Sequence, residues 1–231
     1  MAQIESVKAL AFDVFGTVLD LGGSMTPPLA RLLQEKGTRK AAAQLWAQWR
    51  HRQRIEQYQD TLLMLGHSGY LEAARRALVY TLWMNGVEAT PAEVHQLMES
   101  WKDLLPYPDV AEGLRRLKGR YRLVALSNGD AWFLDHLVRN RIRFDFGGVI
   151  SVDTVGVFKP HPAVYRRAAA IMELEPNQVM MVSSNSFDVL GARACAMRGA
   201  FVNREDLPYE DTRYLPDITV RDFSELADAL A

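Results

Sequence analysis

The sequence predicts an α/β protein, with a Rossmann-like parallel sheet core and a helical cap inserted after the first strand. Two observations carry this prediction. Short apolar runs alternate with helical patterns through most of the chain, and one long segment carries helical patterns alone. Strands buried on both faces of a parallel sheet are hydrophobic without alternation, as these runs are. Alternating strands and helices imply parallel strands joined by right-handed crossovers.

The expected strands are apolar runs that end in polar or turn residues. Four of them lie at residues 7–13 (VKALAFD), 121–129 (YRLVALSNG), 147–151 (GGVIS) and 178–185 (QVMMVSSN). Two shorter runs, at residues 201–203 and 217–220, would extend the same sheet.

The expected helices of the core place apolar residues three or four positions apart. They lie at residues 109–120, 131–141, 162–174 and 187–199. Pro162 is well placed to open the third of these helices. Gly199 is well placed to close the fourth.

The segment from residue 21 to residue 104 shows helical periodicity and almost no strand-like run. Its helical patterns lie at residues 27–37, 40–66, 70–86 and 90–104, the last beginning with Thr90, Pro91 and Glu93. We therefore expect residues 1–20 and 105–231 to form the catalytic core and residues 21–104 to form a cap. Ligands bind outside the carboxyl ends of the strands in such sheets, so a cap emerging there would exclude water from the site.

Composition narrows the class of protein. The chain has 231 residues, of which 48% are hydrophobic, and a formal net charge of −1. A near-zero charge implies no general attraction to nucleic acid or to an anionic membrane. The single Cys195, expected to be a small buried hydrophobe, excludes an intrachain disulfide and a multi-cysteine zinc site. No apolar run is long enough to span a membrane, the N-terminus lacks signal-peptide features, and a cytoplasmic location is expected.

Polar side chains cluster where the expected strands end. Because the carboxyl ends of parallel strands meet at one edge of a sheet, these side chains should share one pocket. The first strand ends at Asp13. The others contribute Ser127, Asn128, Lys159, Ser183, Asn185 and Asp188. An acid that closes an apolar strand is costly to bury unless it is paired or used.

Taken together, these motifs resemble those of the haloacid dehalogenase superfamily, and in detail its (S)-2-haloacid dehalogenase (type II) branch. The matching pieces are FDVFGTVLD, LSNG, the Lys159-Pro160 loop with Tyr165 six residues on, and VSSNSFD followed by GARACAMRGAFVNR. The resemblance covers nearly the whole chain, and the motifs are specific as a set.

The resemblance implies a role for each matching residue. Asp13 would attack C2 of a 2-haloalkanoate and form an ester, which water then hydrolyses. The implied catalytic residues are Asp13, Thr17, Arg50, Lys159, Tyr165, Ser183, Asn185 and Asp188. The implied substrate-binding residues are Phe15, Arg50, Ser127, Asn128 and Phe187. Arg50 follows Trp49 and would stabilise the leaving halide, and Arg54 is the alternative for that position.

Phe15 separates two branches of the superfamily. Its phosphatases carry an acid at this position, which donates a proton to the leaving oxygen, and they use magnesium. A halide leaves as an anion and needs no proton, so an apolar ring is acceptable here. Lys159 would offset the charges of Asp13 and Asp188 so that both carboxylates stay ionised. We therefore expect no metal and no cofactor.

The expected function is metal-independent hydrolysis of short (S)-2-haloalkanoic acids to (R)-2-hydroxyalkanoic acids. The alternatives are a magnesium-dependent small-molecule phosphatase, a covalent hydrolase acting on another carbon electrophile such as a fluoro acid, and an inactive binding protein. The expected partner is a small 2-halo carboxylate, with no nucleic acid and no membrane. The family resemblance also suggests a homodimer.

Overall fold

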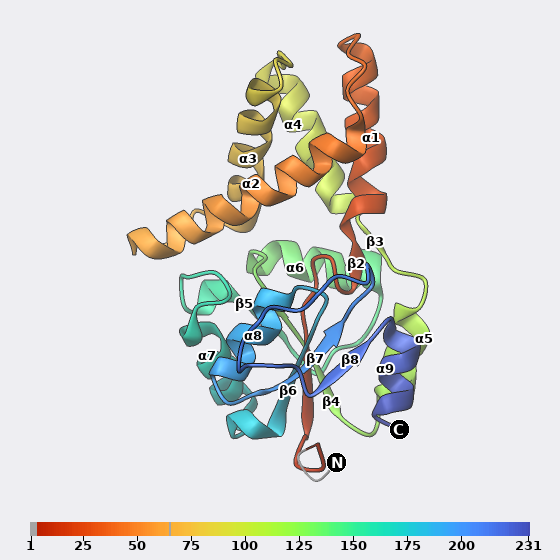
Figure 1. Cartoon of the computed structure of the whole chain (residues 1–231), viewed down its shortest axis with the longest axis vertical. Helices are drawn as coiled ribbons and strands as arrows, with labels where there is room; N and C mark the ends of the chain where they lie inside the picture. The colour runs from red at the N-terminus through yellow and green to blue at the C-terminus, as the bar shows by residue number, and fades with distance from the viewer. Residues whose placement is uncertain (1–3, 65) are drawn as a thin grey trace. The chain divides into compact units, whose positions relative to one another are not determined.

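The computed structural model describes residues 4–64 and 66–231 of the chain. These residues form two compact units, which are described separately (Figure 1). Among the described residues, one unit combines residues 4–19 with Pro106–Ala231, and the other comprises residues 20–64 and 66–105. The chain passes between the units at β2 (Leu19–Asp20) and β3 (Leu105–Pro106), which pair as a two-stranded sheet.

The first unit is built on a parallel sheet whose strand order is β5-β4-β1-β6-β7-β8. The strands are β1 (Ala9–Phe12), β4 (Arg122–Ser127), β5 (Val149–Ser151), β6 (Val179–Ser183), β7 (Arg198–Val202) and β8 (Ile218–Val220). The α/β class with a parallel sheet core is thereby confirmed. β1 lies between β4 and β6, and all four of its residues are buried.

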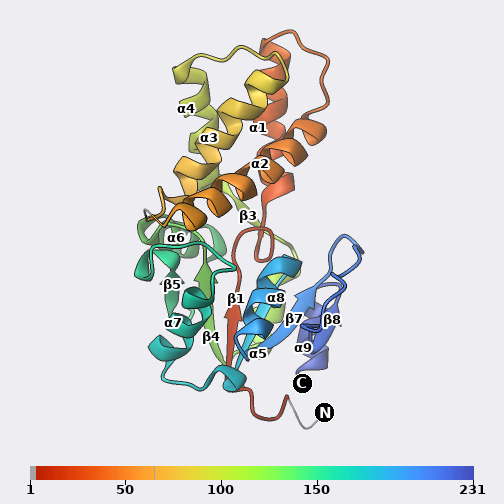
Figure 2. The ribbon, with the colours of Figure 1, turned by 60° about the vertical axis from the view of Figure 1, so that its left-hand side comes forward.

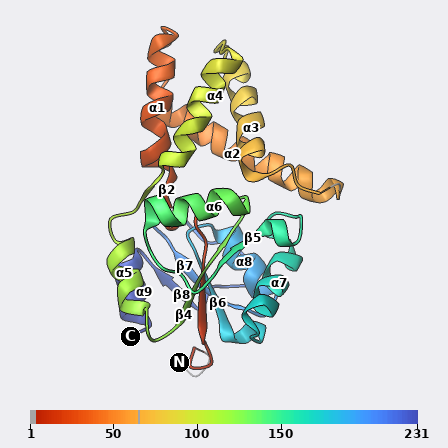
Figure 3. The same ribbon diagram turned by 180° about the vertical axis from the view of Figure 1, so that it is seen from behind.

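Helices cover both faces of this sheet (Figure 3). They are α5 (Val110–Leu117), α6 (Ala131–Leu137), α7 (Pro162–Met172), α8 (Ser186–Ala194) and α9 (Phe223–Ala229), with a π-helical turn at Val138–Ile142 and 3₁₀ turns at Val152–Thr154 and Pro176–Gln178. Side chains of α7 and α8 pack on one face against Ala9 and Ala11. On the other face, Phe223 of α9 stacks on Phe12, with ring centroids 5.6 Å apart.

An ion pair joins the start of α5 to the segment after β7. Arg204 donates to both carboxylate oxygens of Asp109, at 3.0 and 2.9 Å, and its guanidinium lies 3.9 Å from the centroid of the Tyr107 ring. The backbone N–H of Phe223 also donates to Asp109, at 2.9 Å. Burial alone would raise the pKa of Asp109, but these hydrogen bonds outweigh it and hold the pKa below its ordinary value.

The second unit is helical (Figure 2). Its elements are α1 (Leu21–Glu35), α2 (Ala42–Leu63), α3 (Tyr70–Met84), α4 (Pro91–Glu99) and a 3₁₀ turn at Ser100–Asp103. The predicted start of the last helix is confirmed, because Thr90 and Glu93 form a reciprocal capping box with Pro91 at the first helical position. The rings of Trp49, Tyr70 and Trp101 pack edge to face inside this unit.

Two helix boundaries differ from the sequence prediction. α8 ends at Ala194, and Gly199 lies inside β7 instead of closing a helix. A Cβ at Gly199 would lie 2.7 Å from Val189 of α8, so this glycine serves close packing of helix on strand. α1 begins at Leu21, six residues before the predicted start, because Asp20 caps it by accepting from the Gly23 N–H.

Cys195 follows α8 and is only partly buried, so the prediction of a buried hydrophobe was too strong. Among residues 4–64 and 66–231, no helix has both the length and the apolar character that crossing a membrane requires.

Candidate active site

The site is centred on Asp13, the first residue after β1. The register pairs Phe12 with Ala125 of β4 and with Val182 of β6, so Asp13 comes level with the ends of both neighbouring strands. Its backbone N–H donates to the Val182 carbonyl at 2.9 Å, which continues the ladder by one residue. Asp13 is 5% exposed, so its carboxylate must find its partners inside the protein.

Two donors reach one oxygen of the Asp13 carboxylate. The Thr17 hydroxyl donates to Oδ2 at 2.8 Å, and the Asn185 side-chain amide donates to the same oxygen at 2.9 Å. Gly16, with φ of +85°, provides the left-handed turn that brings Thr17 back over the strand end. Asn185 is the N-cap residue of α8. The two hydrogen bonds to Oδ2 thereby fix the orientation of the Asp13 carboxylate.

Lys159 links the two buried acids of the site. Its ammonium lies 3.3 Å from Oδ1 of Asp13 and 2.9 Å from Oδ2 of Asp188, and it donates to the Leu126 carbonyl at 2.6 Å. The Lys159 side chain is 1% exposed, so these contacts replace its hydration shell. One buried cation therefore faces two carboxylates and a main-chain oxygen, which leaves the group with an excess negative charge.

Asp188 is held from its other side by Tyr165. The Tyr165 hydroxyl donates to Oδ1 of Asp188 at 2.8 Å, and both side chains are buried. Burial raises the pKa of Asp188 above its ordinary value, while the Lys159 ammonium opposes the shift. Burial, together with the negative charge of Asp188, also raises the pKa of Tyr165 well above its ordinary value, so its hydroxyl remains a donor.

Asn128 and Ser127 lie at the end of β4 and organise the loops around the site. Asn128 Oδ1 accepts from the backbone N–H of Lys159 at 2.8 Å, and Ser127 Oγ accepts from the Gly129 N–H at 3.3 Å. Ser183 plays a similar part after β6, where its Oγ accepts from the Asn185 N–H at 3.1 Å. These contacts fix the backbone on which Lys159 and Asn185 are carried.

Phe15 provides an apolar surface in the same loop as Asp13. Its ring stacks on Phe133 of α6, with centroids 5.8 Å apart, and it is 3% exposed. A Cβ at Gly129 would lie 2.9 Å from the Phe15 ring, so only glycine fits beside it. Phe187, in the first turn of α8, is partly buried. The Phe15 ring is therefore held in place by its packing against Phe133 and Gly129.

Arg50 belongs to the helical unit, on α2. Its Nη1 donates to Oε1 of Gln53, and it also donates to the Tyr70 hydroxyl at 3.2 Å. Its guanidinium lies 5.8 Å from the centroid of the Trp46 ring. Arg50 is partly buried, whereas Arg54, the alternative, is exposed. The local structure therefore holds Arg50 in one orientation.

The structure brings most of the predicted residues of the first unit together. Asp13, Thr17, Lys159, Tyr165, Asn185 and Asp188 form one connected set of hydrogen bonds. The sequence did not predict that the Leu126 carbonyl would accept from Lys159, because every residue has a main-chain carbonyl and its residue type does not reveal this role. It also did not predict Gln53 or Tyr70, although a glutamine three residues after Arg50 on a helix lies on the same side.

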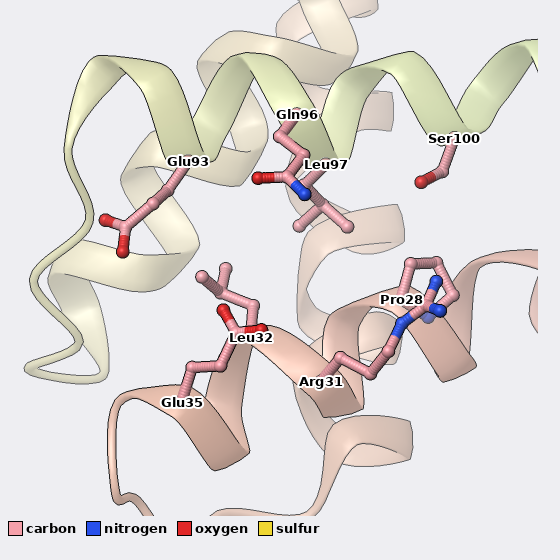
Figure 4. Close-up of a pocket in the computed structure, with 8 residues that line it drawn as sticks. All are labelled: Pro28, Arg31, Leu32, Glu35, Glu93, Gln96, Leu97 and Ser100. Carbon is pink, nitrogen blue, oxygen red and sulfur yellow. The ribbon is translucent and has the colours of Figure 1, made fainter.

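A separate cavity of about 340 Å³ lies between α1 and α4 of the helical unit (Figure 4). Its lining includes the exposed charged residues Arg31 and Glu35. None of its eight lining residues is a predicted site residue.

Comparison with protein families identifies relatives of this chain. Residues 7–196 match the family model described as haloacid dehalogenase-like hydrolase. The chain is 35% identical over 188 residues to the (S)-2-haloacid dehalogenase of Xanthobacter autotrophicus, a match covering 81% of this chain and 71% of that protein.

Solved structures agree with this relationship. The crystal structure of the L-2-haloacid dehalogenase RSc1362 superposes with a TM-score of 0.90 at 25% identity, covering 97% of this chain and 98% of that chain. The Xanthobacter autotrophicus L-2-haloacid dehalogenase with chloropropionic acid covalently bound superposes with a TM-score of 0.83 at 27% identity, covering 97% and 98%.

Proposed function

The chain belongs to the haloacid dehalogenase-like hydrolase family, and from this premise we propose that it hydrolyses short (S)-2-haloalkanoic acids to (R)-2-hydroxyalkanoic acids. The observation that carries the proposal is the pairing of Asp13 with Lys159 and Asp188 beside the packed ring of Phe15. The covalent chloropropionic acid in a related dehalogenase supports a covalent route.

In the first step, Asp13 attacks C2 of the substrate in line with the departing halide. The new C–O bond forms as the carbon–halogen bond breaks, the halide takes the bonding electron pair, and configuration at C2 inverts. Oδ1 is the better placed attacking oxygen. Within the described chain it receives one donor, Lys159 at 3.3 Å, whereas Oδ2 receives two shorter hydrogen bonds.

In the second step, water attacks the carbonyl carbon of the Asp13 ester. Oδ2 then carries the developing negative charge, and Thr17 and Asn185 already donate to it. Fixed donors at a developing oxyanion are among the strongest contributions to acyl-transfer catalysis. Asp188 is the candidate acceptor for the proton of the water. The products are the 2-hydroxy acid and regenerated Asp13, so each turnover consumes one water and releases one halide and one proton.

The remaining predicted residues bind the substrate or position other side chains in this scheme. Ser127 and neighbouring backbone N–H groups bind the substrate carboxylate, with Asn128 close to the halide. Phe15 and Phe187 contact the alkyl part. Tyr165 and Ser183 orient Asp188 and Asn185, and Arg50 stabilises the leaving halide. In this scheme the α/β unit is the catalytic core and the helical unit is its cap.

A magnesium-dependent phosphatase fits these residues less well. Such an enzyme needs acidic ligands for the metal and an acid to protonate the leaving oxygen. Here the carboxylates of Asp13 and Asp188 both face the Lys159 ammonium, and Phe15 occupies the position of the second acid. A divalent cation between these carboxylates would lie against a buried positive charge.

The proposal is tested by measuring halide release from (S)- and (R)-2-chloropropionate with a chelator present. Release from the S enantiomer, with (R)-lactate as product, is expected. Release from neither enantiomer would overturn the proposal. Hydrolysis of phosphate esters that is lost on chelation would favour the phosphatase instead.

We also propose that the protein forms a homodimer through α3. Val79, Tyr80, Trp83 and Met84 are exposed on this helix, and the Trp83 side chain is 76% exposed. Hollows of about 480 and 350 Å³ are both lined by Val79 and Trp83. The protruding Trp83 side chain and these hollows lie on the same surface. This arrangement suits a two-fold interface, in which Trp83 of each copy fills a hollow of the other.

We also propose a cytoplasmic location, because a single cysteine, Cys195, suits a reducing compartment.

A further inference from the structure

Gln53 is a buried polar residue that the mechanism above does not use. It lies on α2, three residues after Arg50, which places the two side chains on the same side of the helix. Gln53 is fully buried, with 0% of its surface exposed. Gln53, Glu56 and Gln57 are all buried, so the second half of α2 turns a polar face inward where an amphipathic helix would present apolar side chains.

The contact with Arg50 fixes the orientation of the Gln53 carboxamide. A guanidinium can only donate hydrogen bonds, so Oε1 of Gln53 must face Arg50 and Nε2 must face away from that bond. Tyr70 accepts from the same Arg50 nitrogen at 3.2 Å, and the centroid of the Trp46 ring lies 5.8 Å from the guanidinium. Arg50 therefore has little freedom to turn once Gln53 is in place.

The Nε2 group of Gln53 is buried and has no hydrogen-bond partner within residues 4–64 and 66–231. Leaving a buried donor unpaired is unfavourable, and such groups occur where a ligand or a water completes them. Since Gln53 touches the guanidinium, an anion that binds Arg50 from this side also comes within reach of the Gln53 amide. An acceptor on a bound ligand would complete this donor.

We propose that Gln53 is both the positioning residue for Arg50 and a second donor to the departing halide. This inference rests on the proposed dehalogenase function. Oε1 holds the guanidinium, and Nε2 donates to the halide as the carbon–halogen bond breaks. The two side chains thus act as one donor pair. A chloride gains more from such donors than a bromide, because its charge is more concentrated.

The test is the leaving-group dependence of the first chemical step. Single-turnover rates of halide release are measured with 2-chloro- and 2-bromopropionate for the wild type and for Gln53→Met. The variant is expected to lose about tenfold or more with the chloro acid. The loss with the bromo acid should be smaller, so that the bromide-to-chloride rate ratio rises at least about threefold. General damage to the fold would lower both rates without raising this ratio. A misplaced Arg50 would raise the ratio too, so the variant described next, which keeps an acceptor for Arg50, separates a lost donor from a misplaced guanidinium.

Two further variants sharpen the result. Gln53→Glu is isosteric and keeps an acceptor for Arg50 but removes the donor, so it should raise the ratio as Gln53→Met does, even if the Met variant folds poorly. Gln57→Met is the matched control, because the Gln57 amide nitrogen is also buried without a described partner but lies seven residues from Arg50, roughly 10 Å along the helix. It should leave the ratio unchanged.

An unchanged ratio in both Gln53 variants of an active enzyme would overturn the inference while leaving the dehalogenase proposal intact. The same rise in Gln57→Met would also overturn it. No halide release by the wild type would instead refute the proposed function.

Discussion

The Thr17 hydroxyl donates a 2.8 Å hydrogen bond to Oδ2 of Asp13, four residues before it in the chain. The same hydroxyl accepts from the backbone N–H of Ser184, also at 2.8 Å. Because the Ser184 N–H occupies an acceptor position of the hydroxyl oxygen, the hydroxyl proton is directed at the carboxylate. Thr17 therefore connects the loop that carries Asp13 to the loop after β6 and fixes the orientation of the Asp13 carboxylate.

Replacing Thr17 by valine should lower kcat for (S)-2-chloropropionate about ten- to a hundredfold. Valine preserves the shape but removes a donor from the oxygen that carries negative charge during ester hydrolysis. Steady-state kinetics check this, with Thr17→Ser as the control that retains the hydroxyl. Equal loss in both variants would indicate that the methyl group matters, and not the hydrogen bond.

Asp13→Asn should reduce dehalogenation by at least about 10⁴-fold, because the proposed nucleophile is gone. The circular dichroism spectrum should stay unchanged. In the wild type, a single turnover in heavy-oxygen water should place the label in Asp13 and not in the hydroxy acid. Label in the product of that first turnover would instead mean direct attack by water on C2.

Lys159→Met should destabilise the protein as well as inactivate it. The buried carboxylates of Asp13 and Asp188 would face each other without their cation, and breaking a buried ion pair costs about 3–5 kcal/mol. Urea unfolding at pH 7 measures the loss. Lys118→Met is the matched control, since Lys118 pairs with the exposed Asp145 and should change stability by less than about 1 kcal/mol. Similar losses in both variants would contradict this assignment.

The pair Asp109–Arg204 should make stability depend on pH in a defined direction. The pKa of Asp109 is lowered in the folded state, so its contribution is present above the unfolded value and is lost as pH falls through the folded value. Asp109→Asn should cost about 1–3 kcal/mol at pH 7 through its lost charged hydrogen bonds. The difference from wild type should be constant above pH of about 5 and shrink below about 4.

Urea unfolding between pH 3 and pH 7 measures this difference, and Asp145→Asn serves as the exposed-acid control. A gap between wild type and Asp109→Asn that widens as pH falls would show that the sign is wrong.

Trp83→Arg should convert the proposed dimer into a monomer. A charge placed at the centre of the apolar α3 face would be buried without a partner in the interface. Sedimentation equilibrium reports the mass of each form. Trp132→Arg is the control, because Trp132 is also exposed, at 60%, but lies on α6. A wild type that is monomeric at high concentration would refute the dimer.

The sequence was informative where a polar residue ends an apolar strand. Asp13 and Ser127 stood out because polar residues closed apolar strands, and the parallel sheet brings such ends together. Lys159 stood out through its motif, and its ammonium is the link between Asp13 and Asp188. The catalytic roles of these residues stay predictions, but their grouping follows from the topology.

The sequence was uninformative where a residue acts through a neighbour that folding supplies. Gly199 looked like a helix end because glycine is common there, but it lies in β7, where packing against Val189 requires a small residue. The helical pattern was placed at residues 27–37, yet Pro27 and Pro28 lie inside α1, whose N-cap is Asp20. Gln53 was not singled out in the sequence, since only the fold buries it beside Arg50.

Because β1 lies between β4 and β6, which follow it in the chain, Asp13 is synthesised before the residues that contact its carboxylate. Asp13 leaves the ribosome before its partners Lys159 and Asn185, which follow 146 and 172 residues later. At synthesis rates of about 5–20 residues per second, the nascent chain carries this carboxylate without these partners for roughly 7 to 34 seconds. Asp13 therefore meets these hydrogen-bond partners only after Lys159 and the start of α8 have been synthesised.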